Sequence, residues 1–159
     1  MEAGTPGRRA PRRAGNRVSL RVTAEDGLPA GSLVVGVGLD LCEIPRVARA
    51  LDRHGARFVE KLFRPGEVRR SPESPAYAEH LAGLFAAKEA AMKALGTGMR
   101  GVSFRELAIV RAPGGPPRLA LFGRALVCGA RLGVAGAHVT ITHTRELAAA
   151  VVVLTGAPL

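Results

Sequence analysis

A run of strong helix formers at residues 80–98 is the feature of this sequence that most constrains the fold. It contains no proline and ends at Gly96 and Gly98, which favour a helix stop. Apolar side chains recur in it at steps of three and four residues, namely Leu81, Leu84, Phe85, Met92 and Leu95. This spacing predicts a long helix at the centre of the fold, with at least one side buried in a core.

A second stripe of the same predicted helix carries opposite charges. Phe85, Glu89 and Lys93 are four residues apart and therefore share one side of the helix. A glutamate four residues before a lysine commonly forms a solvated pair that stabilises a helix by about 0.3 kcal/mol. The alternative is that the carboxylate and the ammonium act on a ligand, and the helix alone does not distinguish the two.

A second carboxylate follows a predicted strand. Residues Ser32 to Val37 are rich in β-branched side chains between glycines, which predicts a buried strand with Asp40 just past its end. There Asp40 either caps the next helix or serves as a ligand. Two carboxylates from separate elements, Asp40 and Glu89, suit a hard cation shared with phosphate oxygens. A dinucleotide-binding loop is excluded, because the third glycine position of that motif falls on Leu41.

The remaining elements are predicted from periodicity and turn residues. A helix from Pro45 to His54 places Arg46, Arg49 and Arg53 along one face, for which a solvated basic surface is the ordinary interpretation. The other predicted elements are a short helix at 58–63, a hairpin of strands 104–110 and 118–122, a short helix at 126–132, and a final hairpin of strands 138–142 and 148–154 with His143 at the end of its first strand. The order of elements predicts an α+β fold in one domain, residues 32–159.

Composition limits the classes of function. The formal charge of +10 favours polyanionic partners, whether nucleic acid, phosphorylated cofactors or an acidic protein. With five Phe, one Tyr and no Trp, a stacking platform for single-stranded bases is not expected. Cys42 and Cys128 stand in no metal spacing, which favours a reducing compartment and a cytoplasmic location.

The ends of the chain and its apolar runs add two expectations. No apolar run is long enough to cross a membrane. Residues 1–31 are rich in Arg, Pro and Gly, which favours a disordered extension or a mis-assigned start over an organelle transit peptide.

Four blocks of the sequence, in this order and at this spacing, resemble a known family. They are Gly-Val-Gly-Leu-Asp at 36–40, Phe-Ala-Ala-Lys-Glu-Ala-Ala-Met-Lys at 85–93, Gly-Thr-Gly at 96–98 and Val-Thr-Ile-Thr-His at 139–143. Together they resemble the holo-acyl-carrier-protein synthases, the small stand-alone class of 4′-phosphopantetheinyl transferases. The resemblance implies a small, mostly antiparallel sheet with a long central helix, in a homotrimer with active sites at the subunit boundaries.

The resemblance also implies a reaction. These enzymes transfer 4′-phosphopantetheine from coenzyme A to a serine of apo acyl carrier protein and release adenosine 3′,5′-bisphosphate. Asp40 and Glu89 match the ligands of Mg²⁺. Lys93 matches a residue that steadies the pyrophosphate or protonates the leaving oxygen, while either Glu89 or a metal-bound water takes the serine proton. Lys88 matches a lysine that is expected to contact phosphate, and His143 a histidine near the adenosine and phosphates.

Further residues match the family more loosely. Gly96, Thr97 and Gly98 would let backbone amides approach the phosphate or the pantetheine arm, although a helix stop already explains them. Arg46 matches a basic position that docks the acidic helix of acyl carrier protein, and Arg49 and Arg53 match less closely.

The sequence departs from the family at Leu84, where many members carry an arginine near the phosphates of the cofactor. The substitution leaves the 3′-phosphate without that partner, unless Arg64 or another base takes its place.

Two other functions remain open from sequence. A basic nucleic-acid-binding module without catalysis would use the positive charge alone. A metal-dependent pyrophosphate hydrolase would use the same ligands, Asp40 and Glu89, but would release its product without a carrier protein.

Overall fold

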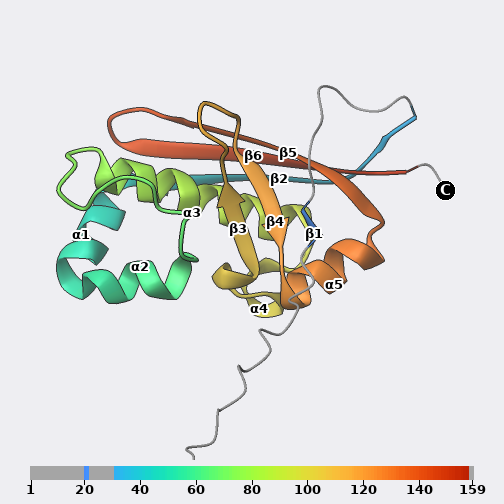
Figure 1. Ribbon diagram of the computed structural model, residues 1–159, viewed down its shortest axis with the longest axis horizontal. Helices are drawn as coiled ribbons and strands as arrows, with labels where there is room; N and C mark the ends of the chain where they lie inside the picture. Colours follow the sequence, from blue (N-terminus) through green and yellow to red (C-terminus); the bar gives the residue numbers. More distant parts are fainter. Residues whose placement is uncertain (1–19, 22–30, 158–159) are drawn as a thin grey trace, which may run out of the picture.

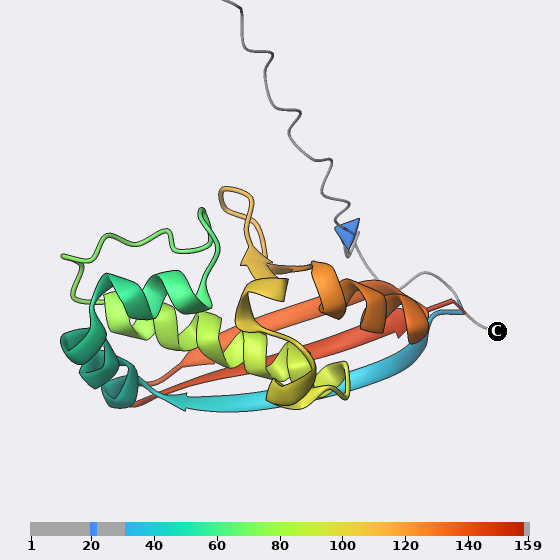
Figure 2. The ribbon, with the colours of Figure 1, turned by 90° about the horizontal axis from the view of Figure 1, so that it is seen from below.

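The fold consists of two three-stranded antiparallel sheets around one central helix (Figure 1). The computed structural model describes residues 20–21 and 31–157. The first sheet has the order β2-β6-β5 and the second the order β1-β4-β3. Helix α3 packs on one face of the first sheet, and Figure 2 shows that α2, α5 and the β3–β4 hairpin lie on the same side.

The bounds of the elements are as follows. The strands are β1 (Leu20–Arg21), β2 (Leu33–Glu43), β3 (Leu107–Val110), β4 (Arg118–Leu121), β5 (Val134–His143) and β6 (Leu147–Gly156). The helices are α1 (Ile44–His54), α2 (Ala56–Leu62), α3 (Tyr77–Ala94), α4 (Gly98–Gly101), the 3₁₀ helix η1 (Phe104–Glu106) and α5 (Gly123–Arg131). None of the helices in the described ranges is long and apolar enough to cross a membrane.

The predicted α+β class, the central helix and both hairpins are confirmed. The structure corrects three details. There are two small sheets rather than one, residues 104–106 form η1 rather than strand, and the short α4 follows the predicted helix stop. Of the predicted extension, residues 1–19 and 22–30 lie outside the described residues, while Leu20–Arg21 form β1 against β4.

The first strand is longer than the sequence predicts, and this changes the place of Asp40. Strand β2 pairs with β6 along almost its whole length, so Asp40 lies inside the strand, opposite Ala150. Asp40 is therefore not past the end of the strand, and the residue before α1 is Glu43. The capping alternative for Asp40 is thus excluded.

Helix α3 is buried around almost its whole circumference. From Leu81 to Ala94 every residue is buried except Phe85, Glu89 and Lys93. These three form the stripe that the sequence singles out. The predicted core residues of the helix are buried, with Leu81 fully enclosed and Phe85 only half-buried.

Two glycines of β2 allow α3 to approach the sheet. A Cβ atom at Gly38 would overlap the carbonyl oxygen of Ala90 and lie 2.7 Å from the Ala94 nitrogen, and one at Gly36 would overlap the Ala94 carbonyl. Two residues of a strand span about 6.6 Å, and four residues of a helix span about 6 Å. Gly36 and Gly38, two residues apart on β2, therefore meet residues that are four positions apart on α3. Asp40 continues the same face of the strand and therefore comes beside the outer stripe of α3.

The opposite face of the first sheet is uncovered by any described element. Val37, Leu39 and Leu41 of β2 are each more than half exposed. Their partners on β6 are Val153, Val151 and Ala149, so the exposed face is apolar across two strands. We call this surface the open sheet face.

Glu106 anchors the chain between α4 and α5. Its carboxylate accepts hydrogen bonds from the Ser103 nitrogen (2.7 Å), the Arg124 nitrogen (2.8 Å) and the Arg124 guanidinium (3.2 Å). Burial alone would raise the pKa of Glu106, but these hydrogen bonds and the Arg124 charge outweigh it and lower the pKa to about 2.

The glycine contact predicts a strong effect of a single methyl group. Gly38→Ala should lower the free energy of unfolding by about 3 kcal/mol, because the new Cβ meets backbone atoms that cannot move aside. Urea unfolding would measure this change. Gly115→Ala, in the β3–β4 turn where the nearest atom is 3.4 Å from the added Cβ, should change stability little. Equal stability of the two variants would contradict the close packing.

The Glu106 contacts predict a pH-dependent stability. The folded pKa lies below the ordinary value of 4.5, so the stabilisation is complete above pH 4.5 and is lost as the pH falls towards 2. Glu106→Gln should therefore be less stable than the wild type at pH 6, with a difference that shrinks at pH 2.5. Urea unfolding at both pH values checks this. The control is Glu60→Gln, at an exposed side chain with no hydrogen bond to a described residue, which should match the wild type at pH 6.

Candidate active site

Asp40 and Lys93 meet between β2 and α3. The Lys93 ammonium donates to Asp40 Oδ1 at 2.8 Å and to the Leu39 carbonyl at 2.9 Å. The Asp40 side chain is 13 % exposed and that of Lys93 is 51 % exposed, so the pair lies at the edge of the solvent. Solvent-exposed pairs of this kind contribute little to stability, which leaves both groups available to a ligand.

Glu89 belongs to the same group of charges. Burial raises the pKa of Glu89, the negative charge of Asp40 raises it further, and the charges of Lys93 and Arg46 oppose the shift. Two carboxylates that repel each other in this way favour a cation between them. The structure brings Asp40 and Lys93 into direct contact, with Glu89 one turn before Lys93 on the same stripe of α3, and the action of these three groups on a ligand stays a prediction.

The donor set fits a hard divalent cation. Among the described residues no group of three or more His, Cys, Asp or Glu side chains could hold a metal ion. A cation at Asp40 and Glu89 would therefore take two protein carboxylates and complete its shell with water and substrate oxygens. This is the mode of binding that Mg²⁺ prefers at phosphate sites.

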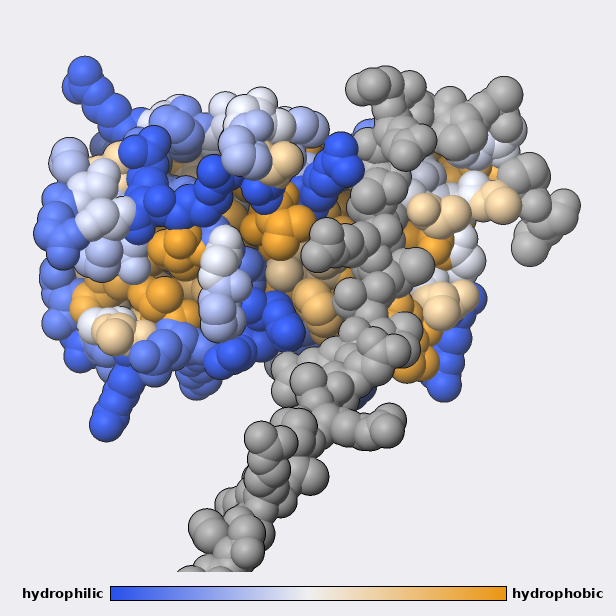
Figure 3. Space-filling model, in the orientation of Figure 1, coloured by the Kyte–Doolittle hydropathy of each residue, from blue (hydrophilic) through white to orange (hydrophobic). Residues whose placement is uncertain are grey.

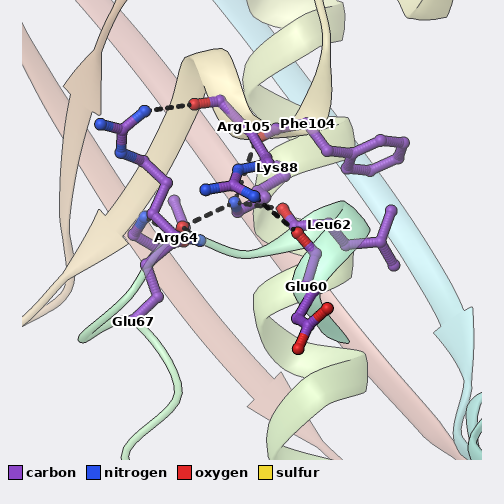
Figure 4. A network of polar contacts seen from close by, with 8 residues as sticks. Glu60, Leu62, Arg64, Glu67, Lys88, Phe104 and Arg105 are labelled. Atoms are coloured by element: carbon purple, nitrogen blue, oxygen red, sulfur yellow. Dashed lines mark hydrogen bonds and ion pairs between the residues drawn. The ribbon is translucent and has the colours of Figure 1, made fainter. Parts of the chain in front are cut away.

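The predicted phosphate contact of Lys88 needs correction. The Lys88 side chain is fully buried, and its ammonium donates to the Leu62 carbonyl (2.8 Å), Glu67 Oε1 (2.9 Å) and the Phe104 carbonyl (3.0 Å) (Figure 4). All three of its protons are thus used inside the protein. Burial lowers the pKa of Lys88 to about 8, against the opposing effect of Glu67.

The loop at 96–98 ends the central helix. The Thr97 nitrogen donates to the Met92 carbonyl at 3.2 Å and the Gly96 nitrogen to the Lys93 carbonyl at 3.0 Å, the pattern of a Schellman motif with Gly96 at φ = 68°. Gly98 also has a positive φ, of 55°. The helix stop that the sequence predicts is confirmed, and the contact of this loop with phosphate stays a prediction.

A basic pocket lies beside His143, at the end of β5. It has a volume of about 550 Å³, and its cationic lining consists of Arg69, Arg70 and Arg111, while His80 and His143 also line it. Leu84 forms part of its wall. His143 Nε2 lies 3.4 Å from Glu79 Oε1, whereas none of the three arginines forms an ion pair with a carboxylate in the described part of the chain.

The basic pocket and the carboxylates lie on different sides of α3. Asp40 pairs with Ala150 and Ala150 with Ile141, so Asp40 and the pocket residue Ile141 are two strands apart, about 10 Å. His80 and Glu89 are nine residues apart on α3, which corresponds to half a turn around the axis at 100° per residue. Within one chain the helix therefore separates the two features.

Arg64 does not lie in the basic pocket. Its guanidinium donates to the Arg105 carbonyl at 2.9 Å and lies 3.9 Å from the centre of the Phe122 ring. The prediction that Arg64 replaces an arginine at position 84 therefore needs correction. The bases that line the pocket beside Leu84 are Arg69, Arg70 and Arg111, which the sequence analysis missed because they come from separate segments.

An apolar pocket of about 690 Å³ opens beside α1. Phe58, Phe85 and Phe104 line it, and Phe85 stacks on Phe104 with ring centres 5.0 Å apart. Its basic lining residues are Arg46, His54, Lys61 and Arg105. Hydrophilic side chains surround small apolar patches at the α1–α2 end of the molecule (Figure 3).

The predicted basic face of α1 is present. Arg46, Arg49 and Arg53 are all exposed. Arg46 lines the apolar pocket and adds a positive charge near Glu89, while Arg49 and Arg53 lie outside the pocket lining.

Cys42, which also lines this pocket, is a free thiol. Burial raises its pKa to about 11, and the negative charge of Asp40 adds to this shift. It is therefore not a nucleophile at neutral pH.

Comparisons with known proteins agree with this geometry. A sequence profile of the 4′-phosphopantetheinyl transferase superfamily matches residues 36–152. The chain is 45% identical to the holo-[acyl-carrier-protein] synthase of Maridesulfovibrio salexigens over 124 residues, which are 77% of this chain and 98% of the relative. It is 41% identical to that of Koribacter versatilis over 123 residues, with the same shares covered.

Solved structures give the same result. The crystal structure of holo-[acyl-carrier-protein] synthase from Neisseria meningitidis has a TM-score of 0.67 at 31% identity, over 77% of this chain and 98% of that one. The Helicobacter pylori enzyme in complex with coenzyme A has a TM-score of 0.63 at 27% identity, over 74% and 98%. From the sequence match, the shared fold and the carboxylates beside α3, we conclude that this chain belongs to the 4′-phosphopantetheinyl transferase superfamily.

Proposed function

We propose that the protein transfers 4′-phosphopantetheine from coenzyme A to a serine of an apo acyl carrier protein. The observation that carries this proposal is the contact of Lys93 with Asp40 at the edge of the solvent, one helical turn from Glu89, in a chain whose relatives are holo-acyl-carrier-protein synthases. In the reaction a bond forms between the serine oxygen and the β-phosphorus of coenzyme A, and the bond from that phosphorus to the bridging oxygen breaks. Adenosine 3′,5′-bisphosphate leaves.

The side chains around Asp40 suit a transfer at a pyrophosphate. Catalysis of this kind depends on positioning and on neutralising charge at the phosphate oxygens. A Mg²⁺ ion held by Asp40 and Glu89 would supply that neutralisation. Lys93, whose side chain is half exposed, would turn to the phosphate and donate a proton to the leaving oxygen. Either Glu89 or a water on the cation would accept the serine proton.

The basic pocket supports a site for the 3′-phosphate of coenzyme A. Arg69, Arg70 and Arg111 offer positive charge without carboxylate partners in the described residues, at the position where the family arginine is replaced by Leu84. His143 lies at the rim, as its match to the family motif implies. We assign the 3′-phosphate of coenzyme A to this pocket and its diphosphate to the side of α3 that carries Lys93 and faces Asp40. The loop at 96–98 follows Lys93 closely in sequence.

Self-association would bring the two features together. Within one chain α3 lies between the two features, and a neighbouring copy that placed its basic pocket beside Asp40 would let one molecule of coenzyme A contact both. The open sheet face supports such contact, because Val37, Leu39 and Leu41 would otherwise leave a continuous apolar surface in water. We propose a homotrimer, the assembly that the family resemblance implies.

The carrier protein would dock on α1. Exposed Arg46, Arg49 and Arg53 match an acidic helix in charge, and the apolar pocket beside Arg46 can take one of its apolar side chains. The pocket also adjoins Phe85, one turn before Glu89 on the same stripe, so a helix bound there would lie next to the carboxylates.

Both cysteines are free thiols, which accords with a cytoplasmic site of action.

The carboxylates provide the first test of this function. Incubation with coenzyme A, Mg²⁺ and apo acyl carrier protein should add one phosphopantetheinyl group to the carrier, as measured by mass spectrometry. Asp40→Asn and Glu89→Gln should each slow the transfer about a hundredfold or more, because each removes a charge that neutralises the phosphates.

Glu43→Gln is the matched control for these variants. Its carboxylate is exposed at the end of the same strand, and its rate should equal that of the wild type. An unchanged carrier with release of free phosphopantetheine would instead identify a hydrolase. Tight, salt-sensitive binding of random duplex DNA that both variants retain would favour a nucleic-acid-binding module.

The basic pocket predicts a loss that depends on the 3′-phosphate. Arg70→Ala combined with Arg111→Ala should raise KM for coenzyme A on the order of tenfold, since two charge-assisted contacts are lost. With dephospho-coenzyme A the same variant should behave like the wild type. Arg131→Ala, at an exposed arginine of α5, should change neither KM. Equal losses with both donors would contradict the assignment.

The open sheet face predicts that assembly and activity are linked. Val37→Glu should dissociate the assembly, because it puts a charge in the middle of the apolar contact, and transfer should fall with it. Light scattering measures the mass and mass spectrometry the transfer. Val127→Glu, at a half-exposed apolar residue on α5, should leave both unchanged. A wild-type protein that is monomeric and active would refute the proposed assembly.

A further inference from the structure

Lys88 and Glu67 form a buried ion pair that the proposed reaction does not use. Their side chains are 0% and 1% exposed, and the charged atoms are 2.9 Å apart. Burying two charges is costly unless every donor and acceptor finds a partner. The pair therefore requires an explanation beyond the folding of an ordinary core.

Every part of the pair is hydrogen-bonded, and the partners come from four different elements. Lys88 reaches the carbonyl at the end of α2 and the carbonyl of Phe104 in η1. Glu67, labelled in Figure 4, accepts from the Arg64 nitrogen at 2.6 Å. It also accepts from the Ile109 nitrogen of β3 at 3.0 Å. One ammonium on α3 is thus tied to α2, to the turn that follows it, to η1 and to β3.

Lys88 makes the directional contacts of the buried part of α3. From Leu81 to Ala94 it is the one buried polar side chain, and the buried apolar residues of this range include six alanines. The glycine contact with β2 fixes the distance to the sheet, but apolar packing is not directional. A buried polar group is the kind of feature that specifies one arrangement.

The anchored residue is the neighbour of a proposed metal ligand. Adjacent side chains on an α-helix point about 100° apart, so the direction of Lys88 sets that of Glu89. We infer that Lys88 is a positioning residue, whose ion pair with Glu67 fixes the rotation of α3 and thereby the direction in which Glu89 points. The inference rests on the proposed transfer reaction, because Glu89 is useful only where it meets Asp40. It also explains why Lys88 is part of the same short block as Glu89 and Lys93 although it reaches no ligand.

The test separates positioning from folding with a pair of variants. Lys88→Met alone leaves the Glu67 carboxylate buried without a counter-ion, and should lower the thermal midpoint by about 10 °C or more. Adding Glu67→Gln removes that charge and retains one acceptor oxygen, for one of the two backbone amides, so the double variant K88M/E67Q should recover part of the midpoint. If the pair positions Glu89, kcat of the double variant should nevertheless stay at least tenfold below the wild type, with KM for the carrier unchanged. Wild-type kcat in the double variant would overturn the inference.

A control variant shows what loss of stability alone does. Leu121→Ala removes a fully buried side chain from β4 that packs against α5 rather than the pair. It should lower the thermal midpoint by a similar amount and keep kcat within about twofold at temperatures where it is folded. A comparable fall of kcat in this control would mean that any destabilisation slows the reaction, which would also overturn the inference.

A second measurement follows the orientation of α3 without catalysis. A Cβ built on Gly83 would lie 2.9 Å from the γ2 methyl of Ile141, so a strong nuclear Overhauser effect is expected between this methyl and the Gly83 α protons. It should persist in Leu121→Ala and weaken in K88M/E67Q. A full signal in the double variant would overturn the inference whatever its kcat. If the double variant does not fold, Glu67→Gln alone carries both comparisons.

The two proposals fail in different ways. A wild-type protein that modifies no carrier would refute the proposed function, yet the Overhauser signal would still report whether the ion pair orients α3. A wild-type protein that is active, with K88M/E67Q equal to it in kcat and in signal, would refute only the positioning role.

Discussion

The close approach of α3 to β2 is the contact on which the site depends. Gly36 and Gly38 leave no room for a side chain between strand and helix, so the backbones themselves touch. At this distance the next residue on the same face of the strand, Asp40, lies within 2.8 Å of the Lys93 ammonium. A longer separation would leave the carboxylate and the stripe of α3 as two unrelated surface features. The glycines thus serve the site through packing, without contact with any ligand.

The positive charge of the chain is divided among distinct places. Lys93 lies beside Asp40, the arginines of the basic pocket line another side of α3, and the arginines of α1 face solvent. Lys88 is enclosed and neutralised by Glu67. The net charge alone suggests a polyanion-binding surface, but this arrangement is more selective. In the proposed reaction these places would serve a diphosphate, a phosphomonoester and an acidic helix.

The sequence predicts those parts of the site that lie within one element. The stripe of Phe85, Glu89 and Lys93 follows from helical periodicity, and the helix stop at Gly96 follows from glycine. It also predicts the order of elements, since hydrophobic patterns and turn residues mark them locally. The end of β2 escapes prediction because pairing with β6 extends a strand past the point where its own composition stops favouring one. Likewise, Arg69 and Arg111 are 42 positions apart in the chain and meet only after folding.

The contacts of Lys88 do not follow from its sequence motif. A lysine next to a metal ligand suggests a phosphate contact, because lysine is rarely buried and charge near an active site usually acts on the substrate. A helix surrounded by core on nearly every side changes that expectation, since only one narrow stripe can reach a ligand. Any charged residue of the buried part of α3 outside the stripe needs a partner in the interior, and for Lys88 this partner is Glu67.

Leu84 also lies outside the stripe, at a buried position of α3. An arginine at this position would point into the basic pocket, where Arg69, Arg70 and Arg111 already supply positive charge. With leucine at position 84, the positive charge of this pocket comes from the segments around α3 and not from the helix itself.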